Sequence, residues 1–408
     1  MTKLEELVQE LCPEGVTYKT LGEIATDVFR GAGITRDQVR ETGTPCVRYG
    51  EIYTTYGVWF EDCVSHTDET LLTSKKYFGY GDILFAITGE SVEDIAKCCA
   101  YIGHETCLAG GDIVVLKHNE DPKYLSYALS TLDAQKQKSK GKVKSKVVHS
   151  SVPDIKAIRV PVPPLPVQRE IVRILDDFAA LTAELTAELT ARKQQYAYYL
   201  DELLTFSSQN EQCVSIELGS IGKVSMCKRI MKAETSPTGD VPFYKIGTFG
   251  KEPDAYISRK KFEEYRKAYS FPKKGDVLIS AAGTIGRTVI YDGEDAYYQD
   301  SNIVWIDNDE SIVLNRYLFY CYQLQPWVVS EGGTIARLYN DNISRAKIYV
   351  PSIEEQKRII AILDRFDTLC TDLSSGLPAE IEARQKQYEY YRDKLLSFKE
   401  ISDNEQEE

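Results

Sequence analysis

Two long amphipathic segments dominate the hydrophobic pattern of the chain. In the first, apolar residues recur at alternating spacings of three and four, with one slip between Leu189 and Tyr196. They are Ile171, Ile174, Phe178, Leu181, Leu185, Leu189, Tyr196, Tyr199, Leu203 and Phe206. This spacing is typical of a helix that packs along another helix, as in a coiled coil. A helix of about forty residues would be roughly 60 Å long.

The second segment repeats this pattern between Ile359 and Phe398. The run from Ser374 to Pro378 interrupts it. Because Gly376 favours the end of one helix and Pro378 the start of the next, we expect a kink or a break at this point.

The stretches 1–160 and 207–350 have a different pattern, in which short β-rich runs alternate with glycines and prolines. Examples are Asp112–Leu116 and Asp276–Ser280, which predict strands. Short helices are expected from Pro122 to Lys138 and from Asn315 to Val329. The sequence therefore predicts mixed α/β domains joined to long helices.

One half of the chain repeats the other. Pro163–Phe178 closely matches Pro351–Phe366, and Gln195–Phe206 closely matches Gln387–Phe398. The globular parts match only in outline, at Leu21–Ile24 with Leu218–Ile221, Pro45–Gly50 with Pro242–Gly247, and Gly81–Gly89 with Gly275–Gly283. The period is too long for a solenoid. Two copies instead predict a pseudo-twofold molecule with two diverged α/β domains.

Composition adds few constraints. With 408 residues, 43% hydrophobic and 27% charged, the chain has room for two or more globular domains. It has no apolar run long enough for a membrane span and no signal peptide at Met1, so we expect a cytoplasmic protein. The ten cysteines are then expected to be reduced. The densest group, Cys98, Cys99, His104 and Cys107, lacks the regular spacing of a zinc site.

We find no catalytic constellation. Phe29-Arg-Gly-Ala-Gly33 imitates a loop that binds S-adenosylmethionine in adenine methyltransferases, but the Asn/Asp-Pro-Pro-Tyr/Phe tetrapeptide that must accompany it is absent. Gly283-Thr-Ile-Gly-Arg287 lacks the Gly-Lys-Ser/Thr of a phosphate-binding loop. The four histidines show no metal-ligand spacing.

Local charge favours binding to nucleic acid despite a net charge of −13. Every second residue from Lys136 to Lys146 is lysine, and a glycine-bearing cationic segment, Glu331–Leu338, lies at the equivalent place in the second half. The alternative is a solvated surface loop. The candidate DNA contacts are Arg48, Tyr49, Thr88, Lys138, Lys140, Lys142, Lys144, Lys146, Tyr244, Lys245, Thr284, Arg287, Gly333, Thr334 and Arg337, for which the alternatives are strand ends and turns.

Together these motifs resemble the specificity subunits of type I restriction–modification systems, over essentially the whole chain. The most specific matches are Pro164–Val172, Glu354–Ile360 and Tyr388–Phe398, with the paired Gly-Asp-Ile/Val-Leu runs at Gly81 and Gly275. The resemblance implies target-recognition domains at 1–163 and 207–350, a central spacer helix at 164–206 and a distal spacer helix at 351–400, before an acidic tail at 401–408. The two helices would pack antiparallel as a coiled coil.

The resemblance also implies function and partners. Each domain would read one half of a split, asymmetric double-stranded DNA sequence, and the helices would fix the gap. Two modification (methyltransferase) subunits would dock around the helices, and restriction subunits would join them. S-adenosylmethionine, ATP and magnesium would bind to those partners and not to this chain. We assign the docking contacts to Gln168, Tyr196, Tyr199, Gln356, Tyr388 and Tyr391.

Three alternatives remain open. The chain would suit a type II system with a fused nuclease–methyltransferase equally well, and the partner that copurifies would separate the two. A coiled-coil scaffold that binds proteins predicts no affinity for DNA. A methyltransferase in its own right predicts binding of S-adenosylmethionine, and the missing tetrapeptide argues against it.

Overall fold

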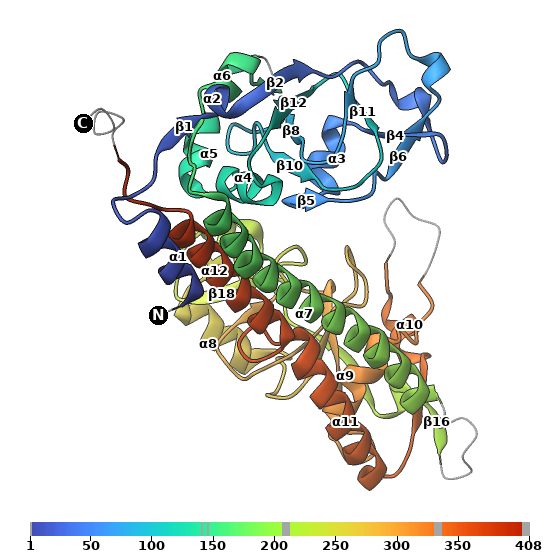
Figure 1. The fold of residues 1–408 in the computed structure, drawn as a ribbon. Helices are drawn as coiled ribbons and strands as arrows, with labels where there is room; N and C mark the ends of the chain where they lie inside the picture. Colours follow the sequence, from blue (N-terminus) through green and yellow to red (C-terminus); the bar gives the residue numbers. More distant parts are fainter. Residues whose placement is uncertain (1, 140–141, 145–146, 206–212, 330–336, 402–408) are drawn as a thin grey trace. The chain divides into compact units, whose positions relative to one another are not determined.

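The computed structural model describes residues 2–139, 142–144, 147–205, 213–329 and 337–401. The chain forms two compact units: unit 1 contains residues 1–185 and 381–408, and unit 2 contains residues 186–380. Each unit combines a mixed α/β domain with parts of the long helices (Figure 1). Within each unit, the predicted mixture of sheets and helices is confirmed. Among the described residues, no helix is both long enough and apolar enough to cross a membrane.

The globular part of unit 1 is built on two five-stranded sheets. The first has the order β2 (Ala25–Arg30), β12 (Ile113–His118), β8 (Ile83–Ala86), β10 (Cys98–Tyr101) and β5 (Trp59–Phe60). The second has the order β3 (Val39–Arg40), β6 (Ser65–Thr67), β4 (Thr44–Val47), β11 (Cys107–Ala109) and β7 (Tyr77–Phe78). Strands β8 and β10 are buried along their whole length, which explains their continuous apolar sequence.

Smaller sheets and short helices complete unit 1. The sheets are β1 (Tyr18–Thr20) with β15 (Arg159–Pro161), and β13 (Lys142–Lys144), β14 (Val147–His149) and β9 (Thr88–Gly89). The helices are α1 (Lys3–Leu11), α2 (Leu21–Ile24), α3 (Tyr49–Thr54), α4 (Pro122–Leu129), α5 (Leu132–Lys138) and α6 (Val152–Lys156). The helix expected from Pro122 to Lys138 is thus present in two pieces. The break occurs because Thr131 caps α5, where its hydroxyl accepts a hydrogen bond from the Ala134 N–H.

Unit 2 repeats this plan with fewer strands. One sheet has the order β17 (Gly222–Met226), β23 (Ile303–Asn308), β20 (Val277–Ser280) and β21 (Thr288–Ile290). The others are β19 (Tyr256–Ile257), β18 (Val241–Tyr244) and β22 (Tyr297–Tyr298), and β16 (Val214–Glu217) with β24 (Lys347–Val350). The short helices are α8 (Arg259–Ala268), α9 (Asn315–Gln323) and α10 (Asn340–Ser344).

The strand pairing shows the duplication more clearly than the sequence does. The order β2–β12–β8 in unit 1 corresponds to β17–β23–β20 in unit 2, with antiparallel pairing throughout. In both units a parallel pair stands in the second sheet, β4 with β11 and β18 with β22. Strands β1 and β15 pair as β16 and β24 do. The two globular parts are therefore diverged copies of one topology.

The long segments are helical as predicted. Helix α7 (Leu165–Thr205) runs for 41 residues without a break. The second segment is divided into α11 (Ile353–Thr371) and α12 (Leu377–Leu395), so the predicted break is confirmed. At the break the Gly376 N–H donates to the carbonyl of Asp372. A Cβ at Gly376 would lie 2.6 Å from the carbonyl oxygen of Thr368, so this tight turn requires glycine.

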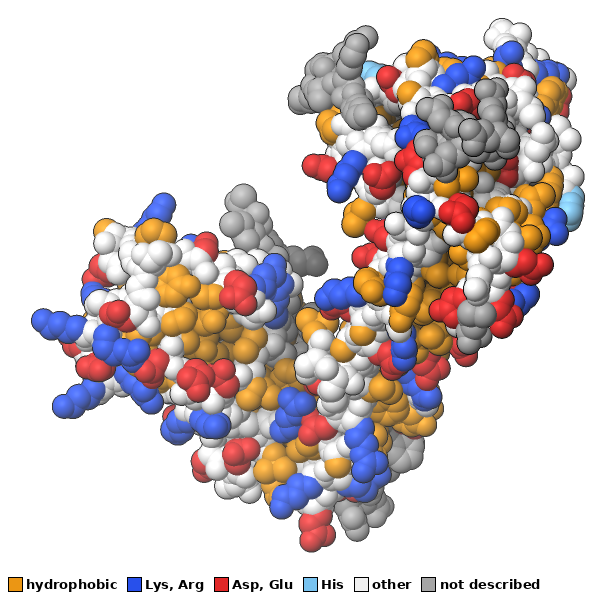
Figure 2. Space-filling model, turned by 60° about the vertical axis from the view of Figure 1, so that its left-hand side comes forward, with side chains coloured by type: hydrophobic (Ala, Val, Ile, Leu, Met, Phe, Trp, Pro, Cys, Tyr) orange, Lys and Arg blue, Asp and Glu red, His pale blue; other side chains and the backbone are white. Residues whose placement is uncertain are grey.

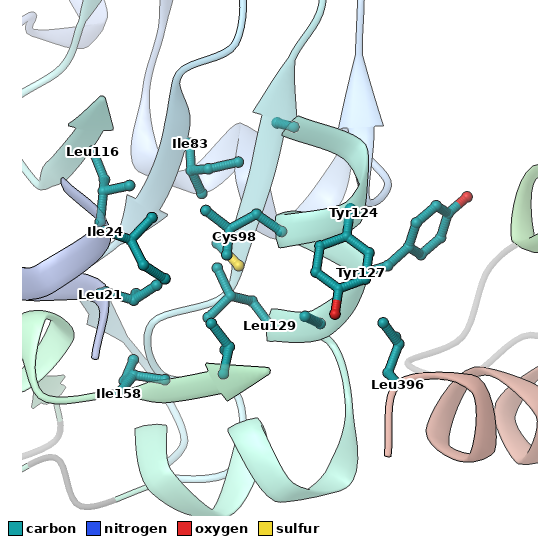
Figure 3. Close-up of a cluster of buried hydrophobic side chains, with 14 of the residues drawn as sticks. Leu21, Ile24, Ile83, Cys98, Leu116, Tyr124, Tyr127, Leu129, Ile158 and Leu396 are labelled. Atoms are coloured by element: carbon teal, nitrogen blue, oxygen red, sulfur yellow. The ribbon is translucent and has the colours of Figure 1, made fainter. Parts of the chain in front are cut away.

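Each globular core is completed by apolar side chains from two helices. In unit 1 these are Val167, Ile171 and Leu175 at the start of α7, together with Leu396 just after α12. Figure 3 shows Leu396 beside Tyr127 of α4 in this core. In unit 2 the corresponding residues are Ile359 and Leu363 of α11 with Leu200 and Leu204 at the end of α7. Helix α7 therefore contributes to both cores.

Aromatic rings mark the contact between helices inside each unit. In unit 1 the ring of Phe178 in α7 stacks on Tyr391 of α12, with centroids 5.5 Å apart. In unit 2 the ring of Phe366 in α11 stacks on Tyr199 of α7, also at 5.5 Å, and on Tyr196 at 6.2 Å. The early part of one helix thus packs against the late part of the other, as antiparallel packing requires.

Two glutamines at matched positions fix the start of each helix to its own globular domain. The Gln168 amide donates to the carbonyl of Pro163 at 2.8 Å and to Glu120 at 2.7 Å, and its oxygen accepts from the Asp121 N–H. Gln356 likewise donates to the carbonyls of Pro351 and Ile312 and accepts from the Leu314 N–H.

Both glutamines are completely buried, at 0% exposure. Our assignment of Gln168 and Gln356 to partner docking is therefore wrong, because neither side chain reaches the surface. The four seam tyrosines assigned to docking, Tyr196, Tyr199, Tyr388 and Tyr391, are half-buried in helix contacts. In the same motifs Tyr198 and Tyr390 are 61% exposed.

Replacement of either glutamine by leucine should lower the free energy of unfolding by about 2–4 kcal/mol, because each change leaves a backbone N–H and a carbonyl buried without a partner. Urea unfolding of Gln168→Leu and Gln356→Leu, followed by circular dichroism, measures this loss. Gln385→Leu, at an exposed position of α12, is the control and should change stability by less than about 0.5 kcal/mol. Equal stabilities for all three variants would contradict the anchoring role.

Candidate nucleic-acid interface

In unit 1, loops from four parts of the sequence meet where β2 ends and β12 begins. The N–H of Ala32 donates to the carbonyl of Ala109, and the N–H of Gly110 donates to the carbonyl of Val47. The N–H of Ile87 donates to the carbonyl of Asp112. These bonds bring together residues 30–33, 48–49, 87–88 and 110–112, which we call the loop edge of unit 1.

Two predicted contact residues, Arg48 and Tyr49, lie on this loop edge. Arg48 caps α3, and its Nε lies 3.2 Å from Glu51, which also accepts a hydrogen bond from Ser65. The Arg48 side chain remains 33% exposed and Tyr49 is 39% exposed. Both border a groove of about 510 Å³ whose other walls are Gly33, Ile34, Arg36, Gly50, Glu51, Thr54, Gly110, Gly111 and Asp112.

Glycines let the backbone come close at this edge. A Cβ on Gly31 would lie 2.0 Å from the carbonyl oxygen of Gly110, so only glycine allows the two loops to pack. The first glycine of the Phe29–Gly33 motif is therefore explained by loop packing, whereas a Cβ on Gly33 would meet no atom within 4 Å. Exposed backbone next to arginine and tyrosine side chains suits contact with phosphates and base edges.

From Thr88 the loop edge of unit 1 continues toward the lysine run Lys136–Lys146. Strand β9 pairs with β14, and the Thr88 hydroxyl lies 3.2 Å from Nδ1 of His149. Strand β14 in turn pairs with β13, so Lys142 and Lys144 belong to a hairpin. Their side chains, and the whole of Lys140 and Lys146, lie outside the described residues.

Lys138 does not fit the predicted phosphate contact. It ends α5, and its side chain turns inward, where its ammonium donates to the carbonyl of Leu129 at 2.6 Å. Its exposure is only 5%. The assignment of Lys138 to DNA binding is therefore wrong, because the lysine caps the end of α4 instead.

Unit 2 has a corresponding loop edge where β17 ends and β23 begins. The N–H of Gln299 donates to the carbonyl of Tyr244, and the Gln299 side chain accepts from the N–H of Ile246. The N–H of Ala281 donates to the carbonyl of Asn302, and the N–H of Leu338 donates to the carbonyl of Ala281. These bonds join residues 244–246, 280–287, 299–302 and 337–338, and the ion pair of Arg229 with Asp300 adds residues 227–231.

The predicted residues of unit 2 meet on this edge. Arg337 donates to the carbonyl and the hydroxyl of Ser301, and Arg287 donates to the carbonyl of Phe249. Lys245 forms an ion pair with Asp254 at 2.8 Å. Thr284 is exposed beside them, whereas Gly333 and Thr334 lie outside the described residues. Burial raises the pKa of Tyr244, so its phenol stays neutral at physiological pH.

Two arginines on these edges were not predicted from the sequence. Arg30 forms an ion pair with Asp112 in unit 1, and Arg229 forms one with Asp300 in unit 2. Arg30 belongs to the glycine motif that was tested only as a cofactor loop. The available signal was that Arg30 ends β2 and Arg229 follows shortly after the end of the matched strand β17.

Local charge differs strongly between the two units. Residues 228–274, which connect β17 to β20, contain twelve lysines and arginines against six aspartates and glutamates, a net charge of +6. The equivalent stretch 32–80 of unit 1 contains five against seven, a net charge of −2. Figure 2 shows that cationic and anionic side chains are interspersed over the visible surface. The acidic total of the chain is thus compatible with a locally basic edge.

The predicted absence of regular metal-ligand spacing concerns mainly Cys98, Cys99, His104 and Cys107. Cys98, Cys99 and Cys107 are buried, and across the described residues no three His, Cys, Asp or Glu side chains gather as metal ligands. The arrangement favours binding through arginine, lysine and backbone groups.

Comparison with known proteins points in the same direction. The model of the type I restriction modification DNA specificity domain matches the chain twice, at residues 13–192 and 210–383. A putative type I restriction enzyme specificity subunit from Haemophilus influenzae is 56% identical over 63% of this chain and 68% of its own length. The EcoR124I/EcoR124II specificity subunit from Escherichia coli is 34% identical over 68% of this chain and 70% of its own length.

Solved structures show the same fold. The S subunit of a type I restriction-modification system from M. genitalium superimposes with a TM-score of 0.54 at 14% identity, covering 98% of this chain and all of that one. A chain from a study of assembly and conformational transition of the type I system gives a TM-score of 0.60 at 18% identity, covering 95% and 98% of the two chains.

The buried position of Lys138 gives a test that separates structure from phosphate contact. Lys138→Met should lower the free energy of unfolding by about 1–3 kcal/mol, because the Leu129 carbonyl loses its buried donor. The salt dependence of DNA binding should not change. Lys136→Met, at an exposed position of α5, is the control for stability. A salt slope reduced by about one in Lys138→Met, with stability intact, would contradict this assignment.

Proposed function

The chain belongs to the family of DNA specificity subunits of type I restriction–modification systems, and we propose that its two units each read one half of a split DNA sequence. The observation that carries this proposal is the duplicated loop edge. Both units gather arginine, tyrosine and exposed backbone groups at the same end of the same strand pair, and unit 2 adds Lys245. Two different readers on one chain suit an asymmetric, two-part target.

Helix α7 supports the proposal that the gap between the half-sites is fixed. It is continuous for 41 residues, its start is buried in the core of unit 1, and its end is buried in the core of unit 2. A stiff helix of this kind, anchored in a core at both ends, acts as a spacer. Each reader would then meet DNA at a set distance from the other.

We assign the chemistry to other polypeptides. Modification subunits would bind S-adenosylmethionine and methylate adenine, and restriction subunits would use ATP and magnesium, all in the cytoplasm. The sequence supports this division because the Phe29–Gly33 loop lacks the methyltransferase tetrapeptide. The exposed Tyr198 and Tyr390, which occur at equivalent places in the two helices, are better candidates for partner contacts than the buried glutamines.

The spacer can be tested at a repeat within α7. Residues 181–188 read Leu-Thr-Ala-Glu twice. Deletion of Leu185–Glu188 removes about 6 Å of helix and rotates the remainder by only about 40°. We expect the gap in the methylated sequence to shorten by one or two base pairs, while both half-sites stay the same. Sequencing of methylated adenines measures this change.

A control for this deletion exchanges Thr186 and Glu188, which alters the sequence of α7 without altering its length. This exchange should leave the gap unchanged. If the deletion changes the half-sites and leaves the gap as it was, helix α7 is not the spacer.

The two edges should contribute to different half-sites. Arg48→Gln and Lys245→Gln should each weaken binding of the target by about 5- to 100-fold, as expected for the loss of a charged contact to a base or phosphate. Competition titrations with DNA altered in one half-site at a time will show which half-site each residue serves. If both variants lose the same half-site, the assignment of one reader to each unit is wrong.

A further inference from the structure

The same arrangement lies at one end of the edge strand pair of the sheet in both units, β2 with β12 and β17 with β23. In unit 1 the ion pair of Arg30 and Asp112 lies where β2 ends and β12 begins. In unit 2 the ion pair of Arg229 and Asp300 lies just after the end of β17 and just before the start of β23. The surrounding sequences, Phe-Arg-Gly-Ala-Gly and Cys-Lys-Arg-Ile-Met, have nothing else in common. An arginine held by an aspartate has thus been retained, or has arisen again, at the same end of two diverged domains.

In both arginines the guanidinium group is bound to the protein through its Nε side. In Arg30, Nε donates to the carbonyl of Gly111 at 2.7 Å and Nη2 donates to Asp112 at 2.5 Å. In Arg229, Nε donates to Asp300 at 2.7 Å. Among the described residues, Nη1 of Arg30 and both Nη atoms of Arg229 have no acceptor. The side chains are 58% and 67% exposed, so these donors face solvent.

This geometry suits binding to the major-groove edge of guanine. A guanidinium fixed at its Nε side can still form two parallel hydrogen bonds through its Nη edge, because Nη1 and the second hydrogen of Nη2 remain available in Arg30 and both Nη atoms remain available in Arg229. The edge of guanine in the major groove offers two acceptors, O6 and N7, at the matching spacing, and arginine to guanine is the commonest specific contact with a base. The aspartate orients the arginine beforehand, which reduces the entropy lost on binding.

We propose that Arg30 and Arg229 are specificity-determining residues, each of which reads the guanine of one G·C pair in the half-site of its own unit. This inference rests on the proposed function and deepens it, because it names the base that each unit recognises. It also predicts that the target contains a G·C pair in both halves.

An ordinary surface ion pair is the competing explanation, since exposed pairs contribute little to stability. Two of the other exposed ion pairs serve as matched controls. Arg159 pairs with Glu400 in unit 1, and Arg266 pairs with Asp295 in unit 2. Both arginines are about half exposed and neither is on a loop edge.

The test uses the complete methyltransferase complex assembled with this chain. Adenine methylation is sequenced across a genome for wild type, Arg30→Gln and Arg229→Gln, with Arg159→Gln and Arg266→Gln as controls. We expect Arg30→Gln to extend methylation to sites with another base pair at one G·C position of one half-site. Arg229→Gln should do the same in the other half-site. Discrimination at that position should fall by about 10- to 100-fold.

Further variants separate base reading from support of the fold. Arg30→Lys keeps the charge but cannot form the paired hydrogen bonds, so it should relax the same position as Arg30→Gln. Asp112→Asn and Asp300→Asn should weaken discrimination at those positions without altering the preferred base. Melting temperatures of the purified complexes verify that each variant is folded.

Two results would overturn the proposal. One is an unchanged methylated sequence in Arg30→Gln and Arg229→Gln; the other is a uniform loss of methylation at all sites, as a phosphate contact would give. Failure of the wild-type complex to methylate any specific sequence would instead refute the proposed function itself.

Discussion

Each globular domain relies on apolar side chains from two helical segments that are remote in sequence. The core of unit 1 needs Leu396 from the end of the chain, and the core of unit 2 needs Leu200 and Leu204 from the end of α7. Burial of side chains of this size contributes about 1.5–3 kcal/mol each. Helix α7 therefore supplies side chains to both cores, and neither domain is complete within one continuous stretch of sequence.

This constraint explains why the helices repeat more closely than the domains. A residue in the helices must satisfy a globular core, a helix seam and a buried hydrogen-bond network together. Gln168 and Gln356 each satisfy three backbone or side-chain partners, and Phe178 and Phe366 each stack on a tyrosine of the other helix. The residues of the loop edges do not have to satisfy a core, a helix seam and a buried hydrogen-bond network together. They are free to diverge in sequence, as readers of two different half-sites must.

Much of the fold could be predicted because its signals are local. Periodicity gave the long helices, and Gly376 with Pro378 gave the break between α11 and α12. The run Asp276–Ser280 gave β20 almost to the residue. For the site, Arg48, Lys245 and Arg287 do lie on the loop edges, since residues next to matched strand ends share one end of a sheet.

The errors arose where distant contacts decide the outcome. Lys138 belongs to an alternating lysine run that predicts contact with phosphates, but its ammonium turns inward at the end of α5 and donates to the carbonyl of Leu129. The prediction of Gln168 as a partner contact is wrong because its side chain is buried and bonded to Pro163, Glu120 and Asp121, and the last two are more than forty residues away in the sequence. Arg30 was overlooked because Asp112, its partner, lies 82 residues further along the chain.

The central claim is that two different readers, joined by one continuous helix, recognise two sequences at a fixed separation. It is tested most directly by single-molecule sequencing of methylated adenines in the host genome, with and without this gene. We predict a two-part, asymmetric methylated sequence with a gap of constant length, which disappears when the gene is removed. A contiguous sequence, a gap of variable length, or methylation that persists without the gene would contradict it.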